Sequence, residues 1–330
     1  TPRDNGNNVS MGIYMWRIAS GCNIINNTLS NNYLSIYLKE ADSAIISGNV
    51  ISEGIDKAIS FGGGDNCDYN IVSNNTITML DGCTAGIGFG SNCNNTMIGG
   101  DSINKGNTIT LPESITSGNG YCIYLPNGIT GPQTIQFNTI YGGKRGIQYD
   151  QQSNSSSALN IYDNSISNNG IDVANKIGVG INGANASIMR NTITKTVRPI
   201  LVEGNGIIAN ITNNTIDNSE STDQIYGICC YGSSSDGQGI DMRYNQFIGI
   251  DNSCIWNYSS SGETVDARNC WWGSDSEPTH HLTNQGVKIT GAANYTPWMT
   301  HSGEIPDGET VTENGDASVG QNTDAEVVIT

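Results

Sequence analysis

Three acidic residues lie close enough together in the chain to suggest a metal site. Asp65 and Asp68 belong to the segment GGGDNCDYN, and Asp81 belongs to the next turn-like segment, LDGC. Carboxylates on neighbouring turns can bind Ca²⁺, a hard cation that takes about 6–8 oxygen ligands. The alternative is that all three are loop residues of a strongly acidic protein. The sequence therefore predicts either no cofactor or a Ca²⁺ site at these positions.

Histidine and cysteine, the other common metal ligands, are poorly arranged for that chemistry. The three histidines lie near the C-terminus, and His280 and His281 are neighbours that would point in opposite directions in a strand. None of the nine cysteines forms the C-x-x-C spacing of a zinc site. In an oxidising compartment, Cys67, Cys83 and Cys93 could instead form a local disulfide.

A repeated phrase indicates the elements that position these residues. One Asn recurs at intervals of 22–32 residues, with a large apolar residue two positions later in every copy. An apolar residue also stands three positions earlier, except where Asn104 and Asp266 occupy that column. Asn tolerates left-handed backbone angles, and stacked Asn side chains can hydrogen-bond to one another. The phrase predicts a bend between two strands and a structural ladder formed by Asn27, Asn49, Asn75, Asn107, Asn138, Asn164, Asn191, Asn214, Asn245 and Asn269.

A second phrase follows each copy of the first. In this phrase, as in SIYL, CIYL and GIQY, an Ile or Val and the residue two positions later lie on the same side of the chain. This alternation is typical of a strand with one buried face. Each period then contains about three short strands, and a strand-only repeat of this length is typical of a solenoid. We expect an all-β, right-handed parallel β-helix of about ten coils over residues 1–300, including a closing segment at 267–300.

The composition limits the partners of such a rod. The 330 residues include 14 Lys and Arg against 31 Asp and Glu, for a formal net charge of −17, which disfavours nucleic acid. No apolar run approaches the roughly 20 residues that cross a bilayer, so membrane insertion is not expected. The acidic composition of residues 301–330 predicts a linker-like tail. Its last residues, 325–330, have strand character and could join the sheet of a second copy.

Together the two phrases resemble a known class of proteins. The I-x-x-N-x-I and G-I-x-apolar patterns resemble the right-handed parallel β-helix repeats of carbohydrate-binding and sugar-hydrolase-type proteins, and those of the periplasmic copper-binding β-helix family. The segments ARNCWWGSDSEP (267–278) and NYTPWM (294–299) resemble the closing part of archaeal and bacterial cell-surface β-helix proteins. This resemblance implies an exported protein at a cell surface.

The resemblance does not extend to the catalytic motifs of β-helix enzymes. Polygalacturonase-like proteins carry N-T-D, D-D, G-H and R-x-K motifs, and this chain has NTI in place of NTD and no D-D pair. The D-P-H-E motif of alginate-epimerase-like proteins is also missing from the sequence. We therefore expect no catalytic residue, although a polysaccharide lyase or hydrolase remains an alternative, as does a non-catalytic glycan-binding module.

Two surfaces could contact a ligand or partner. The residue between the two apolar positions of the second phrase points outward, and it is aromatic at Tyr37, Tyr124 and Trp256, which could stack on sugar rings or on a partner protein. Longer connections at 80–86, 112–121, 168–177 and 218–226 form a second surface, because insertions in a solenoid gather on one side.

These observations favour a secreted structural or adhesive protein over an enzyme. We expect a cell-surface β-helix that serves as a filament or surface-layer protomer. It would contact other copies of itself through its ends and tail, or it would contact surface glycans. Export would also permit N-glycosylation at the sequons of Asn94, Asn154, Asn185, Asn257 and Asn294.

Overall fold

The computed structural model describes most of the repeat region and parts of the C-terminal segment. The described residues are 10–18, 21–62, 67–113, 115, 119–129, 131–167, 176–204, 207–220, 226–232, 239–250, 252–259, 264–273, 278, 280–281, 289–296, 298–299, 311–313, 317–319 and 327–329. Within these ranges the side chains of 18, 152–157, 232, 259, 280–281 and the last three segments are not described. Apart from η1 (Ile103–Lys105), a short 3₁₀ segment, every element is a strand.

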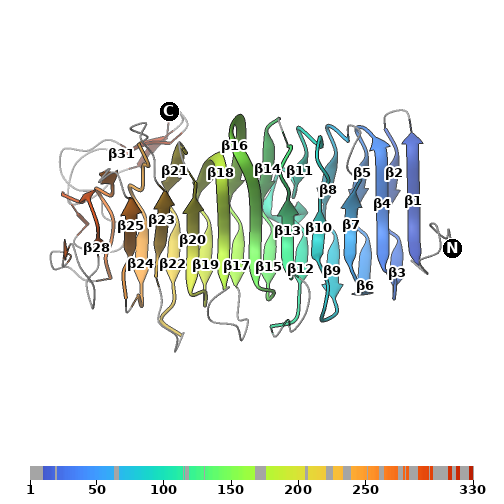
Figure 1. Ribbon diagram of the computed structural model, residues 1–330, viewed down its shortest axis with the longest axis horizontal. Coiled ribbons are helices and arrows are strands. Elements are labelled where there is room, and N and C mark those ends of the chain that lie inside the picture. The colour runs from blue at the N-terminus through green and yellow to red at the C-terminus, as the bar shows by residue number, and fades with distance from the viewer. Residues whose placement is uncertain are drawn as a thin grey trace.

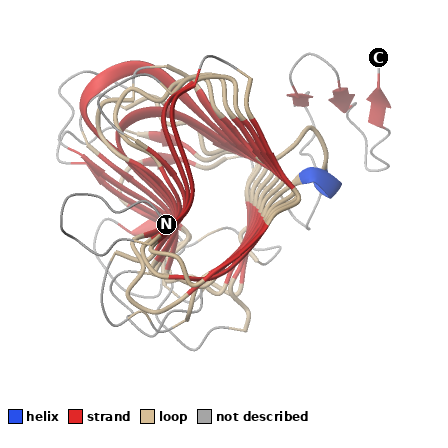
Figure 2. Ribbon diagram, turned by 90° about the vertical axis from the view of Figure 1, so that its right-hand side faces the viewer, coloured by secondary structure: helices blue, strands red, loops and turns tan. Residues whose placement is uncertain are grey.

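The strands form three long faces that run along a rod, and most coils contribute one strand to each face (Figures 1 and 2). All pairings along the rod are parallel and join one coil to the next, so the expected parallel β-helix is confirmed. The third face contains nine strands, which corresponds to about nine complete coils where the sequence suggested about ten.

The first face carries the second phrase of the repeat. It contains β1 (Met11–Ile18), β4 (Leu34–Ala41), β7 (Lys57–Phe61), β10 (Ala85–Gly88), β13 (Tyr121–Leu125), the first part of β16 (Arg145–Tyr162) and of β18 (Ile177–Met189), β20 (Arg198–Glu203), β23 (Ile228–Gly232), β25 (Ile255–Ser259) and β28 (Ile289–Thr290).

The other two faces flank the repeated Asn. The second face contains β2 (Asn23–Ile25), β5 (Ile45–Ser47), β8 (Ile71–Ser73), β11 (Met97–Ile98), β14 (Gln133–Gln136), the later parts of β16 and β18, and β21 (Ala209–Thr212). The third face contains β3 (Thr28–Ser30), β6 (Val50–Gly54), β9 (Thr76–Met79), β12 (Thr108–Thr110), β15 (Thr139–Tyr141), β17 (Ser165–Ser167), β19 (Thr192–Thr194), β22 (Thr215–Asp217) and β24 (Gln246–Ile248).

Columns of aliphatic side chains fill the interior between the faces. One column on the first face runs from Ile36 through Ile59 and Ile87 to Ile289, and these side chains are completely buried. Burial of one such side chain contributes about 1.5–3 kcal/mol, and parallel register repeats the contribution at every coil. The core is therefore continuous along the rod.

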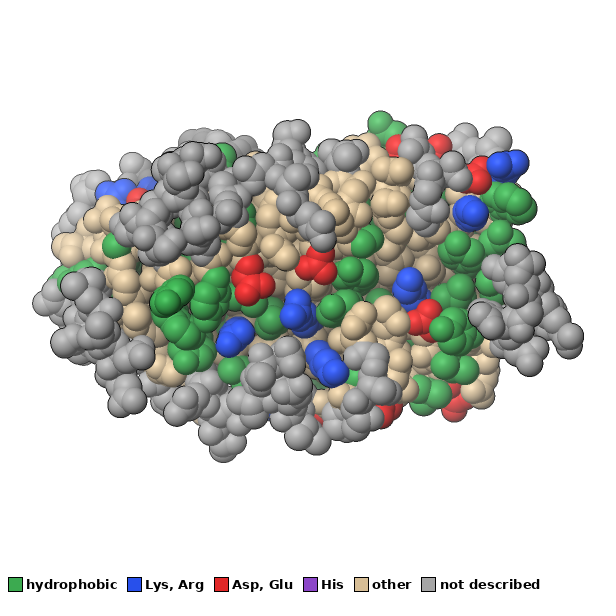
Figure 3. All heavy atoms as spheres, in the orientation of Figure 1, with side chains coloured by type: hydrophobic (Ala, Val, Ile, Leu, Met, Phe, Trp, Pro, Cys, Tyr) green, Lys and Arg blue, Asp and Glu red, His purple; other side chains and the backbone are tan. Residues whose placement is uncertain are grey.

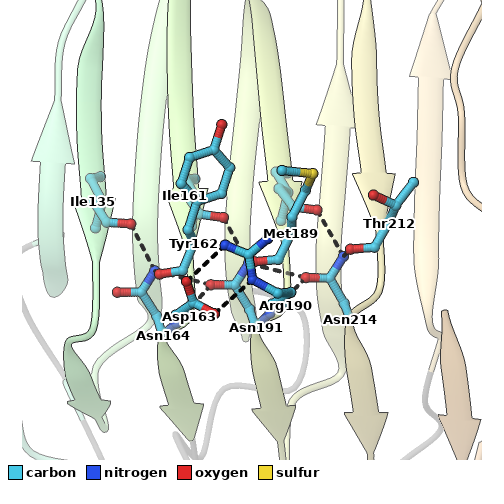
Figure 4. Close-up of polar contacts among 11 residues, drawn as sticks. Ile135, Ile161, Tyr162, Asp163, Asn164, Met189, Arg190, Asn191, Thr212 and Asn214 are labelled. Carbon is cyan, nitrogen blue, oxygen red and sulfur yellow. Dashed lines mark hydrogen bonds and ion pairs between the residues drawn. The ribbon is translucent and has the colours of Figure 1, made fainter. Parts of the chain in front are cut away.

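The Asn ladder forms the bend between the second and third faces (Figure 4). The backbone and side-chain nitrogens of Asn164 both donate to Oδ1 of Asn191, each over 3.0 Å. Asn191 in turn donates to Oδ1 of Asn214 and, through Nδ2, to the carbonyl oxygen of Ile161 on the previous coil. The residue before the ladder Asn is left-handed in most coils, with φ of 54° at Asp163. The predicted ladder is present from Asn27 to Asn245.

The last predicted member, Asn269, is not part of the ladder. Trp271 pairs with Gln246, so Cys270 and not Asn269 stacks on Asn245. The thiol of Cys270 donates to the carbonyl oxygen of Met242, as Asn245 does to the equivalent carbonyl one coil earlier. Asn269 instead takes the left-handed position with φ of 58°, and its buried amide has no hydrogen-bond partner in the described part of the chain. The repeat is shifted by one residue in this coil.

An insertion explains the other irregular position in the sequence columns. The column residue of the fourth coil is Ile98, which pairs with Val72 and Ile135, and not Asn104. Its carbonyl oxygen accepts from Nδ2 of Asn138, as the ladder requires. The segment with η1 lies between Ile98 and the ladder Asn.

The C-terminal part departs from the regular coil. Short strands β26 (Val265–Asp266), β27 (His280–His281) and β29 (Ala293–Asn294) continue the parallel pairing at this end. The tail forms a separate antiparallel sheet of β30 (Val311–Glu313), β31 (Ala317–Val319) and β32 (Val327–Ile329). The predicted strand at 325–330 thus pairs with β31 of its own chain, and addition to a second copy stays a prediction.

Candidate functional site on the first face

The outer side of the first face carries three parallel rows of side chains, which we call the strip. The basic row contains Lys57, Ala85, Tyr121, Arg145, Ile177 and Arg198. The central row contains Tyr37, Ser60, Gly88, Tyr124, Gln148, Gly180, Leu201, Cys229 and Trp256. The acidic row contains Asp150, Asn182, Glu203, Tyr231 and Tyr258. Parallel register aligns the members of each row because one coil repeats the position of the last.

Charged side chains lie over the middle of this face, with apolar side chains on both sides of them (Figure 3). Arg145 donates to Oε1 of Gln148 over 2.7 Å, and Gln148 donates to Oδ1 of Asp150 over 2.6 Å. This chain of hydrogen bonds crosses the strip from the basic row to the acidic row. Gln148 also lies over Gly180, where a Cβ atom would stand 2.2 Å from Oε1. Gln148 is itself only 2 % exposed, and the next coils of the strip carry an apolar cluster of Ile177, Leu201 and Cys229.

Aromatic rings lie on both sides of the charged middle. Tyr121 and Tyr124 stack with centroids 4.6 Å apart on one side. On the other side, Tyr226 stacks on Trp256 at 4.6 Å, and Tyr231 meets the same indole edge-on at 5.4 Å. These rings are half-buried and cover part of one another, so each is only partly accessible to solvent. Tyr258 beyond them is exposed by 64 %.

Burial and nearby acids perturb two tyrosines of the strip. Partial burial, followed by the negative charge of Asp150, raises the pKa of Tyr124 to about 12. Partial burial and the neighbouring Cys229 raise the pKa of Tyr231 to about 12. Both phenols are therefore neutral at physiological pH and can donate as well as accept hydrogen bonds.

The strip contains the three aromatic residues that the sequence analysis selected. Tyr37, Tyr124 and Trp256 belong to the central row and are half-buried, and Tyr37 stacks on Tyr14 at 5.3 Å. Sequence reasoning missed the two flanking rows. Their signal was present three positions before and two positions after the central residue, where the Arg and the acid of RGIQYD and RPILVE stand.

The predicted Ca²⁺ site is not assembled in the described part of the chain. Asp65 lies outside the described residues. Asp68 accepts the backbone N–H of Asn94 over 2.7 Å, and Asp81 is an exposed turn residue. The residues that the structure describes contain no group of three His, Cys, Asp or Glu side chains placed for a metal.

The glycosylation candidates differ in their surroundings. Asn94 and Asn185 are half-buried and accept backbone N–H groups from Gly131 and Ile208. Asn257 is only 7 % exposed and donates to the carbonyl of Ala292, which disfavours modification of the folded chain. Asn294 is exposed, and the side chain of Asn154 lies outside the description.

The side with the insertions offers a small pocket. Ser167, Thr194, Lys195, Asp217, Ser219 and Glu220 line a cavity of about 280 Å³. Lys195 and Glu220 form an ion pair of 2.6 Å across it. Its cation and anion neutralise each other, so the strip is the better candidate for a long ligand.

Comparison with known families agrees with the stacked-coil geometry. Residues 2–182, more than half of the chain, match the family described as periplasmic copper-binding protein (NosD). The chain belongs to the NosD family. Copper sites use thiolate, thioether and imidazole ligands. The described residues of this NosD chain offer no cluster of such groups, so we derive no role through copper.

One solved structure resembles this NosD-family chain at the level of the fold. It is the tailspike gp61 of Pseudomonas phage phi297, with 11 % identity and a TM-score of 0.36 over 78 % of this chain. The match spans about half, 48 %, of the tailspike. No curated protein matches the sequence. Among the described residues, no helix is long and apolar enough to cross a membrane.

Proposed function

We propose that this NosD-family chain is a periplasmic or cell-surface protein that binds a polysaccharide along the strip. The supporting observation is the alignment of aromatic rings and hydrogen-bonding side chains in three rows along one flat face. Sugar rings present apolar surfaces to aromatic side chains and hydroxyl groups to carboxylate, amide and guanidinium groups. An adhesive role follows if the polysaccharide belongs to a surface.

The repeat distance of the rod suits a polymer. Neighbouring coils rise by about 4.8 Å, which is close to the length of one pyranose unit. A sugar chain that lies parallel to the rod axis would therefore meet similar positions at every residue. The ligand could extend from Tyr124 to Trp256, over the coils of β13 to β25.

Affinity electrophoresis through gels that contain a polysaccharide tests this function. Trp256→Ala and Tyr124→Ala should each weaken binding about tenfold, as expected for loss of an aromatic anchor. Tyr69→Ala is the matched control, because Tyr69 is exposed by 62 % and is not a member of the strip. Equal retardation of all three variants and the parent chain would show that the strip does not bind the polymer.

A hydrolase is the second candidate because two carboxylates share the acidic row. Asp150 and Glu203 are two coils apart, which is roughly 10 Å and near the upper end of the separation in inverting glycosidases. An enzyme would release reducing ends from a bound polymer, and Asp150→Asn would abolish that release. A polymer that is bound and stays intact would leave binding as the function.

A further inference from the structure

We infer that the ligand of the strip is an acidic polysaccharide, whose carboxylate or sulfate groups face the basic row. This inference rests on the proposed function and adds the chemical class of the ligand. The chain as a whole is strongly acidic, with 31 Asp and Glu against 14 Lys and Arg. The basic row nevertheless carries three cations, Lys57, Arg145 and Arg198, that form no direct ion pair within the described residues, and their position beside the aromatic side chains requires an explanation.

Six basic residues elsewhere on the rod have acidic partners, whereas Lys39 on β4 lies over the ring of Trp16 and forms no ion pair within the described ranges. These ion pairs are Arg17–Glu40, Lys105–Asp101, Arg190–Asp163, Lys195–Glu220, Arg243–Asp241 and Arg268–Asp266. By contrast, Lys57, Arg145 and Arg198 form no ion pair with any residue in the described ranges. All three belong to the basic row, on β7, β16 and β20.

Arg198 is the cation of the basic row that most clearly lacks an acceptor for one of its nitrogens. Its Nε is buried and has no hydrogen-bond partner among the residues that the structure describes. Burial of a charged donor without an acceptor is costly, and an anion beside it would remove that cost. The charge of Arg198 acts on Cys229 and Tyr231, which places the guanidinium near the central and acidic rows beside Trp256. An acidic group bound there would contact both the guanidinium and the aromatic cluster.

The spacing of the two arginines fits a repeating disaccharide. Arg145 and Arg198 are separated by one intervening coil, that of Ile177, and so by roughly 10 Å along the rod. An acid group on every second sugar would meet both guanidinium groups. The carboxylates of Asp150 and Glu203 on the opposite edge would repel that group and accept hydroxyl hydrogens, which fixes the orientation of the polymer.

The test compares acidic polymers with their neutral counterparts. Polygalacturonate and hyaluronate are measured by isothermal titration calorimetry beside the same polymers after reduction of their carboxyl groups. We expect the acidic forms to bind at least about tenfold more tightly, the loss expected for one charge-assisted hydrogen bond. Arg145→Gln and Arg198→Gln should each remove that preference, while Lys105→Gln, an equal change of charge on η1, should keep it.

The outcomes separate this inference from the function on which it rests. Equal binding of acidic and neutral polymers that Trp256→Ala abolishes would overturn the acidic class and retain polysaccharide binding. The absence of binding to every polymer would overturn both. An acidic preference that the arginine variants leave unchanged would also overturn the inference.

A second inference concerns the buried thiols of Cys67 and Cys93, which precede β8 and β11 of the second face. We propose that Cys67 and Cys93 form a disulfide between neighbouring coils when the protein folds in the periplasm. The pairing of Met97 with Ile71 continues to these residues through a hydrogen bond from Cys67 N to Asn92 O. The two Cα atoms are thus one coil apart, about 4.8 Å, within the roughly 4.4–6.8 Å of disulfides.

The two sulfur atoms also share their surroundings. Both side chains are fully buried, and both thiols lie within 4.0 Å of the carbonyl oxygen of Gly62. A hydrogen bond from Cys93 lowers the pKa of the Cys67 thiol, which favours the thiolate that attacks a disulfide. Exchange with a small disulfide oxidant joins the two sulfurs and releases two reduced thiols from the oxidant. The bond would fix the corner at Gly62, against which the ring of Tyr37 packs.

Thiol counting on protein secreted to the periplasm tests the second inference. We expect seven of the nine cysteines to react in denaturant without reductant, and a peptide map to link Cys67 with Cys93. The variant Cys67→Ser should restore a reactive Cys93, whereas Cys229→Ser should leave the linked peptide unchanged. Nine reactive thiols, or a bond between other cysteines, would overturn the proposal.

Discussion

Each ladder Asn satisfies backbone groups that the sharp bend leaves without strand partners. Asn164 accepts two hydrogen bonds from Asn138 and donates to the carbonyl oxygens of Ile135 and Tyr162. No other side chain of this size carries both a carbonyl acceptor and an amide donor. The recurrence of Asn in the sequence therefore has a structural cause, and it does not indicate a catalytic residue.

Replacement of one ladder residue tests this interpretation. Asn164→Ala leaves several buried backbone groups without partners and should lower the free energy of unfolding by about 3 kcal/mol. Asn23→Ala, at an exposed position of β2, should change it by less than about 0.5 kcal/mol. Denaturant titration of both variants gives the two values. Equal stability of the two variants would contradict the structural role of the ladder.

The shifted tenth coil leads to a more unusual expectation. Cys270→Asn would place an amide where the ladder continues, next to Asn245 and the carbonyl oxygen of Met242. We expect this buried polar substitution to be neutral or to stabilise the chain by about 1 kcal/mol. Cys254→Asn, at an equally buried core position, should cost several kcal/mol. Thermal unfolding that ranks the two variants in the opposite order would contradict the assigned register.

The pKa values of the strip predict a response to alkaline pH. The pKa of Tyr124 is about 12 in the folded chain and about 10 in an unfolded one, so the unfolded state loses its proton first. The contribution of Tyr124 to stability is present below about pH 10 and is lost as the pH rises to about 12. Unfolding of Tyr124→Phe should therefore depend less steeply on pH in that interval. An unchanged slope would show that Tyr124 titrates normally.

At the scale of strands, the repeat columns predict most of the architecture. The apolar residues on both sides of each Asn correctly indicated two strands and a bend. The displaced Ile98 and the one-residue shift at Cys270 could not be predicted, because an insertion and a neighbouring Asn conceal the register. The members of the three rows could be predicted from the second phrase of the repeat. Their residue types alone do not indicate a binding surface, because that surface forms only when the coils align.

A glycine column sets how closely the faces approach each other. A Cβ atom at Gly178 would stand 2.6 Å from the carbonyl oxygen of Pro199 and 2.9 Å from Cγ2 of Ile193. Gly178→Ala should therefore destabilise the chain by about 1–3 kcal/mol through overpacking. Gly239→Ala is the matched control, since no atom of the described residues lies within 4 Å of its Cβ position. Comparable unfolding midpoints would show that the coils can separate at low cost.

At the scale of the molecule, the rod converts a short repeat into a long, regular surface. The fold followed from the sequence because each period repeats the same apolar columns. The function did not, because the catalytic motifs of β-helix enzymes are not in the sequence and the strip is assembled from nine separate strands. Assembly through the ends of the rod stays a prediction, which electron microscopy of the concentrated protein tests.

A crystal structure of the chain with a bound oligosaccharide tests the central claim most directly. We predict that the sugar lies along the outer side of the first face, parallel to the rod axis, between Tyr124 and Trp256. Its rings would contact the aromatic side chains, and any acidic group would lie beside Arg198. A sugar bound in the pocket at Lys195, or on the second or third face, would contradict this account.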